Sequence, residues 1–388
     1  MNNTEKAFIE ILSAFVNERE PELSFEVDGE KLYNLAHSQS VAGIVSFVLH
    51  RAYRDDLLSQ SKKLSTAYDK TIAHVIRREV ETQSLFSQLS AEGIEHITFK
   101  GNVVKRSYPV KELRTFGDID LIIKEENRKK SHAFMIKNGF TSEAMDGGAV
   151  YGYKRGKEFY EIHTSMNSER TKLSDYLKDY WSKTEKKQGL TYEFEPNFHF
   201  CYLISHIEKH VNCSNAGVRM YLDIALILKN DRQSLDLKKV REILRECSLE
   251  KFYDTTLYLC HRWFGTEKLF ESELSESRYE AFCDFTLKGG TFGLLDVGAD
   301  SSVRRSMKDG KVNKAKLILC HVFPPYREVR RMYPFFDGKP YLLPLSWVIH
   351  PFKAAKRSGL KNIKRVVNAD VKTAQQEKEL LRSVGSER

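Results

Sequence analysis

The chain lacks any hydrophobic run long enough to cross a membrane. No stretch of about eighteen uncharged apolar residues occurs, so a spanning helix is not expected. The longest apolar segment, 341–352, is too short and contains two prolines. The first residues lead into an amphipathic pattern and not into a basic and then apolar leader, so no secretory signal is expected. These absences predict a cytoplasmic protein.

Cysteine motifs that bind metals are absent as well. The 388 residues include six cysteines, none forms a C-x-x-C pair, and their spacings match no zinc module. They lie in apolar helical contexts, where a cysteine behaves as a small hydrophobic residue, and we expect reduced thiols. His206 and His210 are separated by Ile-Glu-Lys, so the His-Glu-x-x-His motif of zinc proteases is also missing.

Acidic residues are scarce only at one end of the chain. The formal net charge is +9, but residues 303–388 hold 20 Lys and Arg against 7 Asp and Glu, a net charge of +13. The remainder of the chain therefore carries about −4. The high isoelectric point belongs to the tail and does not by itself identify a nucleic-acid-binding protein.

The spacing of apolar residues predicts an α+β protein. Residues 5–90 show helical periodicity. From Gly93 the pattern changes to strands and short helices in the order β-α-β-α-β-β, which predicts a small mixed β-sheet flanked by helical regions. We expect strands at 94–99, 118–123, 150–153 and 159–163, and helices at 102–107 and 125–138.

After residue 167 the pattern is helical again, and the tail is rich in proline. We expect helices at 173–183, 198–210, 218–228 and 240–249. Six of the nine prolines lie in the tail, so no long continuous helix is expected before Pro351. The predicted organisation has an N-terminal helical region 1–90, a sheet-containing core 91–166, a helical domain 167–300 and a basic, proline-containing tail 301–388.

Paired carboxylates are the most informative residues of the predicted core. Asp118 and Asp120 alternate at the start of an apolar strand, so both side chains are expected on one face. Two adjacent carboxylates repel each other unless a divalent cation lies between them. Glu161, on a later strand, is the best candidate for a third acid that binds a second metal and accepts a proton. A solvent-facing role for Glu161 is the alternative. The pattern predicts metal-dependent phosphoryl or nucleotidyl transfer.

A strand-to-helix turn precedes the acidic strand. Gly101 permits a close approach of the backbone to a phosphate, and Lys100 would neutralise a triphosphate. Arg114 is a second candidate for phosphate contact. The alternatives are an ordinary turn with an exposed lysine, and an arginine paired with the acidic strand.

These motifs resemble a known family. Phe99-Lys100-Gly101, Tyr108-Pro109, Arg114 and Gly117-Asp118-Ile119-Asp120-Leu121 are similar to the core of a bacterial family of uncharacterised nucleotidyltransferases, within the polymerase-β-like superfamily. Further similarities lie at Leu35-Ala36-His37, Tyr160-Glu161-Ile162-His163, His206-x-x-x-His210 and Arg219-Met-Tyr-Leu-Asp223. Together they span residues 30–230 in the expected order.

The resemblance implies a nucleotidyltransferase catalytic core that requires Mg²⁺ or Mn²⁺ and an NTP. It implies Asp118, Asp120 and Glu161 as the metal-binding acids. The Gly-Gly/Ser pair that is usual in the superfamily is replaced by Lys100-Gly101-Asn102, so a serine contact to phosphate is missing. The resemblance does not identify the acceptor.

The downstream helices carry a second set of candidates. His206 and His210 lie one helical turn apart, as do Arg219 and Asp223. The functional interpretation is that His206, His210 and Arg219 contact the nucleotide or the acceptor. The structural interpretation, which spacing favours, is that these residues join two helices and that Arg219 pairs with Asp223.

The tail combines an apolar aromatic segment with a basic one over residues 341–365. This composition suits the surface of an anionic membrane, an acidic partner or RNA. The alternative is a basic tail whose apolar part packs on the helical domain. No RNA-binding motif with stacked aromatic residues occurs, so binding to nucleic acid ranks last.

Two functions from different classes remain open at this stage. The first is an enzyme that transfers a nucleoside monophosphate from an NTP to a hydroxyl or phosphate acceptor. The second is a catalytically inactive nucleotide-binding or scaffold module of a biosynthetic complex, at the membrane in one version. The clustered carboxylates favour the enzyme, because a purely structural domain gains nothing from them.

Overall fold

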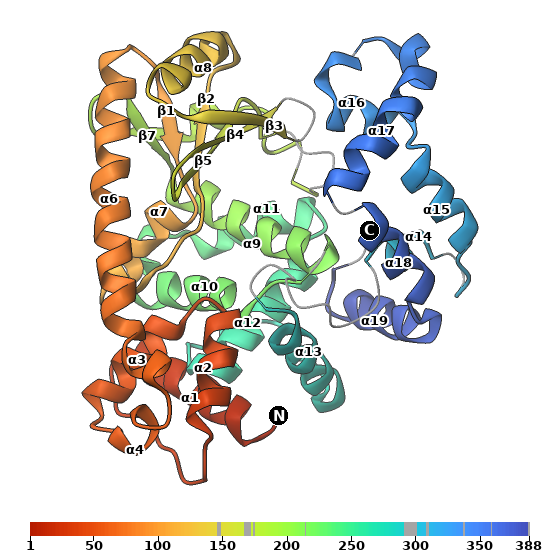
Figure 1. The fold of residues 1–388 in the computed structure, drawn as a ribbon. Coiled ribbons are helices and arrows are strands. Elements are labelled where there is room, and N and C mark those ends of the chain that lie inside the picture. Colours follow the sequence, from red (N-terminus) through yellow and green to blue (C-terminus); the bar gives the residue numbers. More distant parts are fainter. Residues whose placement is uncertain are drawn as a thin grey trace. The chain divides into compact units, whose positions relative to one another are not determined.

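The structure, a computed structural model, consists mostly of helices with a mixed β-sheet in the middle (Figure 1). This confirms the predicted α+β class. The described residues are 1–145, 149–166, 172–173, 175–213, 215–290, 301–307, 310–336, 338–357 and 359–386.

Seven strands form the sheet, in the order β3-β4-β5-β2-β1-β7-β6. The pair β1–β7 is parallel, whereas β3–β4, β4–β5 and β6–β7 are antiparallel. The strands are β1 (His96–Thr98), β2 (Ile119–Ile123), β3 (Thr141–Met145), β4 (Val150–Arg155), β5 (Glu158–His163), β6 (Thr184–Lys186) and β7 (Thr191–Phe194). All five residues of β2 are buried, as expected of a central strand.

Helices precede and follow the sheet in the sequence. The helices before it are α1 (Asn3–Asn17), α2 (Gly29–Ser38), α3 (Ala42–Arg51), α4 (Asp55–Leu58), α5 (Lys62–Ser65) and α6 (Ala67–Ala91), and α7 (Gly101–Val104) and α8 (Arg128–Lys137) lie between strands. After the sheet follow α9 (Pro196–Cys213), α10 (Val218–Asn230), α11 (Leu237–Glu246), α12 (Glu250–Phe264) and α13 (Glu276–Gly289). The C-terminal helices are α14 (Ser301–Ser306), α15 (Lys314–Val322), α16 (Tyr326–Met332), α17 (Leu343–Arg357), α18 (Gly359–Asn368) and α19 (Val371–Ser383). Short 3-10 turns are η1 (Lys105–Ser107), η2 (Lys111–Leu113), η3 (Glu125–Asn127), η5 (Tyr180–Lys183), η6 (Arg232–Ser234), η7 (Pro334–Phe336) and η8 (Pro340–Leu342).

The chain divides into two compact units. The first unit holds Met1–Ile119, Met166–Val297 and Ser383–Ser386, and the second holds Asp120–Ser165, Gly298–Arg382 and Glu387–Arg388. In the first unit, α6 runs beside β1 and β7 (Figure 1), where the ring of Phe86 packs on His96. In the second, His132 of α8 is hydrogen-bonded to the hydroxyl of Tyr153 on β4. The four-part division expected from the sequence stays a prediction.

The predicted helix at 173–183 is wrong. The described residues there form turns and η5, and the chain then adds the hairpin of β6 and β7 to the sheet. Thr191-Tyr192-Glu193-Phe194 has the β-branched and aromatic composition of a strand, and its parallel register with β1 stabilises it. Strand β3 was also absent from the expected set, because Thr141–Met145 is too polar to stand out.

No long continuous helix precedes Pro351 in the described part of the tail, as predicted, since α14, α15 and α16 have 6, 9 and 7 residues. Helix α17 is 15 residues long and contains Pro351 in its interior. Pro344 lies in the first turn, where the missing N–H has no intrahelical partner to lose. Pro351 removes one backbone hydrogen bond, and the helix continues through it.

The six cysteines are free, and Cys201, Cys260 and Cys283 are buried among apolar residues. Burial raises the pKa of the Cys201 thiol to about 12, so it stays protonated and unreactive. Among the helices that the structure describes, none combines the length and the apolarity needed to cross a membrane.

Candidate metal centre

Three side chains of the second unit converge in the sheet. The Nε2 atom of His163 lies 3.0 Å from Oδ1 of Asp120 and 3.7 Å from Oε2 of Glu161. One ligand atom from each of the three residues lies within 4.8 Å of the others. Two carboxylates and an imidazole form a donor set that could hold a divalent cation.

The strand pattern explains this convergence. Along β5, Tyr160 and Ile162 are buried, whereas Glu161 and His163 alternate with them and are only half-buried. Side chains two residues apart share a face of a strand, so Glu161 and His163 point the same way. Strand β2 is the neighbour of β5 and supplies Asp120, which is 6% exposed.

The donor set fits Mn²⁺ at least as well as Mg²⁺. Both ions take carboxylate oxygens, but Mg²⁺ has the stronger preference for oxygen ligands, so the imidazole of His163 is a poorer ligand for Mg²⁺ than for Mn²⁺. If the metal is absent, Nε2–H of His163 donates a hydrogen bond to Asp120 and offsets the repulsion between the two carboxylates.

His163 is the residue of this cluster that the sequence-based site did not include. The sequence does indicate this residue. In the strand segment Glu161-Ile162-His163, Glu161 and His163 are two residues apart and therefore lie on the same face. The motif that carries the family resemblance also ends at His163. Asp118, in contrast, precedes β2 in a bend of the first unit and is not among the clustered ligands. Its catalytic role stays a prediction.

The turn at Lys100 has an unusual backbone. Its φ of 54° and ψ of −133° lie in a region that residues with a side chain rarely adopt. The N–H of Lys100 donates to Nε2 of His199 on α9 at 3.0 Å, and its carbonyl accepts from Val103 and Val104. His199 thus holds a strained turn whose lysine is a predicted phosphate contact.

Because of His199, we expect the free energy of unfolding to depend on pH. Burial, reinforced by the charge of Arg106, lowers the pKa of His199 to about 4. Between pH 6.5 and 4 the ring of His199 is protonated in the unfolded chain but stays neutral in the native protein. The free energy of unfolding therefore falls as the pH falls through this window. We expect this group to lower the free energy of unfolding by roughly 2 kcal/mol from pH 7 to pH 4.5.

Urea unfolding at pH 7 and pH 4.5 measures this effect. His199→Gln, whose amide oxygen can still accept the N–H of Lys100, should lose about 2 kcal/mol less than wild type on acidification. His37→Gln is the matched control, because His37 is exposed, and it should follow wild type. Parallel behaviour of all three proteins would contradict the role assigned to His199.

Arg114 is engaged within the protein. Its Nε and Nη2 donate to the two oxygens of Asp223 on α10, each at 2.7 Å, and its Nη1 donates to the carbonyl of Thr115. The hydroxyl of Tyr108 donates to Asp223 at 2.7 Å. Burial alone would lower the pKa of Arg114, but the charge of Asp223 outweighs it and raises the pKa. Arg114 therefore joins the turn region to α10.

The expected pair of Arg219 and Asp223 takes a different form. Asp223 accepts hydrogen bonds from Arg114 and Tyr108, whereas Nη1 of Arg219 donates to the backbone and hydroxyl of Thr115 at 3.2 Å. Burial and the nearby charge of Arg114 lower the pKa of Arg219 to about 10, although the charges of Asp223 and Asp118 oppose this. Arg219 remains a cation at neutral pH.

Gly101 has a packing role that the sequence did not reveal. A Cβ atom at this position would lie 3.1 Å from Nη1 of Arg114 and 3.2 Å from its Cζ. Because Nε and Nη2 of that guanidinium are held by Asp223 and its Nη1 by the carbonyl of Thr115, it cannot move aside easily. The absence of a side chain at Gly101 therefore leaves room for the guanidinium of Arg114. A contact of Gly101 with phosphate stays a prediction.

The rings of His206 and His210 meet edge to face on one side of α9. Their ring centroids are 4.5 Å apart, and Tyr202 stacks on His206 at 5.7 Å. Both histidines are half-buried. The histidine of α9 that contacts the Lys100 turn is His199, which was not among the predicted site residues. The contacts of His206 and His210 with nucleotide stay a prediction.

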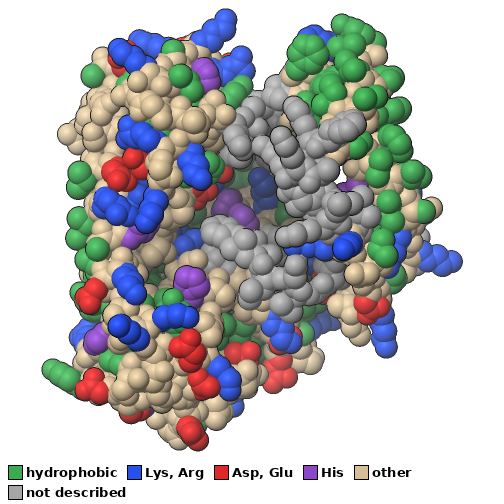
Figure 2. All heavy atoms as spheres, viewed as in Figure 1, with side chains coloured by type: hydrophobic (Ala, Val, Ile, Leu, Met, Phe, Trp, Pro, Cys, Tyr) green, Lys and Arg blue, Asp and Glu red, His purple; other side chains and the backbone are tan. Residues whose placement is uncertain are grey.

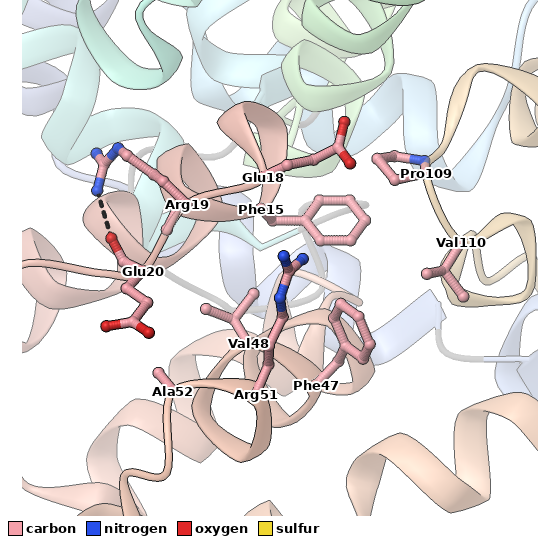
Figure 3. Close-up of a pocket in the computed structure, with 11 residues that line it drawn as sticks. Phe15, Glu18, Arg19, Glu20, Phe47, Val48, Arg51, Ala52, Pro109 and Val110 are labelled. Carbon is pink, nitrogen blue, oxygen red and sulfur yellow. Dashed lines mark hydrogen bonds between the residues drawn. The ribbon is translucent and has the colours of Figure 1, made fainter.

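A small cavity lies away from these residues, in the N-terminal helices (Figure 3). Phe15 and Phe47 line it, and the side chain of Arg51 extends beside them. Its volume of about 130 Å³ is below the 300 Å³ or more of typical ligand pockets. The cavity includes none of the predicted site residues and is not a nucleotide site.

Comparison with known proteins points to one family. A family model described as an uncharacterised nucleotidyltransferase matches residues 26–265, which is more than half of the chain. The matched segment includes the acidic strand β2, all of β5, and both α9 and α10. No curated protein and no solved structure matches the chain.

Proposed function

Because the chain belongs to the family of uncharacterised nucleotidyltransferases, we propose that it moves a nucleoside monophosphate from an NTP to a hydroxyl or phosphate acceptor. The observation that carries this proposal is the cluster of Asp120, Glu161 and His163, since carboxylates gathered on one sheet face are the usual means of binding the cation of an NTP. Asp118 keeps the role of a further acid that the sequence predicts for it.

Asp120 and Glu161 have different surroundings, which supports different roles for them. Asp120 is 6% exposed and hydrogen-bonded to His163, so it is suited to hold a cation in a fixed position. Glu161 has 23% of its side chain exposed and is suited to meet the acceptor. Bound Mg²⁺ or Mn²⁺ would stabilise negative charge on the phosphates.

In the proposed reaction, the acceptor oxygen forms a bond to the α-phosphorus. The bond from that phosphorus to the β-phosphate oxygen breaks, and pyrophosphate leaves with the electron pair. Glu161 accepts the proton of an acceptor hydroxyl and returns it to solvent. Lys100, His206, His210 and Arg219 are proposed contacts of the nucleotide.

A thermal-shift panel tests the proposal without knowledge of the acceptor. ATP, CTP, GTP and UTP would each be added with and without Mg²⁺ or Mn²⁺. One NTP should raise the melting temperature by about 2 °C or more, only when the metal is present, and Asp120→Asn should abolish the shift. Cooperative melting of wild type with no shift for any NTP would overturn the proposal. Binding without release of pyrophosphate at any acceptor would favour the inactive scaffold.

A further inference from the structure

The C-terminal helices of the second unit expose large apolar side chains together. Figure 2 shows them gathered over α15, α16 and α17. Six of them define what we call the α17 surface: Leu319, Phe323, Phe335, Tyr341, Leu345 and Val348. Their exposed fractions range from 47% for Leu345 to 73% for Tyr341. Soluble monomers rarely expose apolar side chains in such groups unless the surface has a function.

Helix α17 carries apolar residues on two faces. On one face, Nε1 of Trp347 donates to the carbonyl of Pro324 at 2.9 Å, and His350 is hydrogen-bonded to Tyr333 at 2.8 Å and to the carbonyl of His321 at 3.0 Å. These contacts fix α17 against the neighbouring helices. The other face presents Leu345 and Val348, one turn apart, to solvent. A helix that is apolar on both faces is not adapted to face water.

A small core lies among other C-terminal helices of the same unit. Val303, Met307, Val366 and Ala374 are buried together, and Leu317 and Ile318 of α15 pack against them. None of the six exposed side chains of the α17 surface belongs to this core. They are available to an external partner.

The charge of the segment that carries this surface indicates what kind of partner fits. Residues 311–365 contain 13 Lys and Arg but only 2 Asp and Glu, a net charge of +11. Among them, Lys311, Lys316 and Lys364 are exposed. A second copy of the chain is a poor occupant, because a two-fold contact would place this positive surface against itself.

We propose that the α17 surface docks on an anionic lipid bilayer. The apolar side chains would enter the interfacial layer, while the basic residues contact the lipid head groups. Tyr341 is of the aromatic type that favours the boundary between lipid and water, because it has both an apolar ring and a polar hydroxyl. Phe335 is of the type that enters the apolar side of this boundary. The docking would be peripheral, since it uses the side of the helices.

Co-sedimentation of the full chain with vesicles tests this proposal. Vesicles of phosphatidylcholine alone would be compared with vesicles that contain phosphatidylglycerol as well, at low and high salt. We expect at least tenfold tighter binding to the anionic vesicles, and weaker binding when salt screens the charges.

Two triple variants make the test specific to this surface. Phe335→Ser/Leu345→Ser/Val348→Ser should weaken binding to anionic vesicles at least tenfold. Tyr53→Ser/Ile76→Ser/Val80→Ser is the matched control, because it changes three equally exposed apolar residues of the first unit, and it should bind like wild type. Unchanged melting temperatures would confirm that both variants fold. Failure of wild type to bind anionic vesicles, or equal binding by the two triple variants, would overturn the proposal, and an acidic protein partner would then be sought.

Discussion

Asp120→Asn is expected to lower the rate of pyrophosphate release from the preferred NTP by about a thousandfold or more, which corresponds to about 4 kcal/mol of lost transition-state stabilisation. The change keeps the shape of the side chain but removes the charge that would hold the cation. Asp120 is buried beside His163, so water has little access to replace the lost ligand.

Stability measurements distinguish this loss from unfolding. In the presence of EDTA, Asp120→Asn should melt at the same temperature as wild type or higher, because it removes the repulsion between two neighbouring carboxylates. Glu158→Gln is the control for the charge change, since Glu158 lies on β5, the neighbour of β2, but pairs with Arg155. It should retain activity within a factor of about three. Retention of more than a tenth of wild-type activity by Asp120→Asn would contradict the account.

Arg114→Ala should destabilise the protein by about 3 to 5 kcal/mol in urea unfolding. In this variant the carboxylate of Asp223 stays buried. It loses the two hydrogen bonds from Arg114 and keeps the one from the hydroxyl of Tyr108. A buried charge without its counter-ion is among the most costly defects of a core.

An exposed pair provides the matched control for Arg114. Arg54 contacts Asp56 with the same two-point geometry, at 2.8 and 2.6 Å, but at the surface. Arg54→Ala should therefore cost less than about 1 kcal/mol. The double variant Arg114→Met/Asp223→Leu should be more stable than Arg114→Ala, because it removes both charges. Equal costs for the buried and the exposed pair would refute the role assigned to Arg114.

The local part of the fold could be predicted from the sequence. The strands β1, β2, β4 and β5 lie within or overlap the expected ranges, because β2 is a short apolar run and because buried and less buried residues alternate along parts of β4 and β5. The hairpin of β6 and β7 was missed, because it depends on pairing with β1 almost a hundred residues earlier. Local periodicity carries no information about such a partner.

The candidate site shows the same division between local and distant information. Glu161 and His163 share a strand face, which follows from their spacing alone. The bond of His199 to Lys100 joins residues 99 positions apart, and the pair of Arg114 and Asp223 joins residues 109 positions apart. No spacing rule predicts either contact. They could be found only after α9 and α10 had been placed beside the turn.

The most direct test of the central claim is a titration of Mn²⁺ into wild type, Asp120→Asn, Glu161→Gln and Glu158→Gln, with free Mn²⁺ followed by electron paramagnetic resonance. The account predicts that wild type and Glu158→Gln bind Mn²⁺ alike, whereas Asp120→Asn and Glu161→Gln bind at least about tenfold more weakly, since each loses one charged ligand. Equal binding by all four proteins would show that the cluster of Asp120, Glu161 and His163 is not the metal centre.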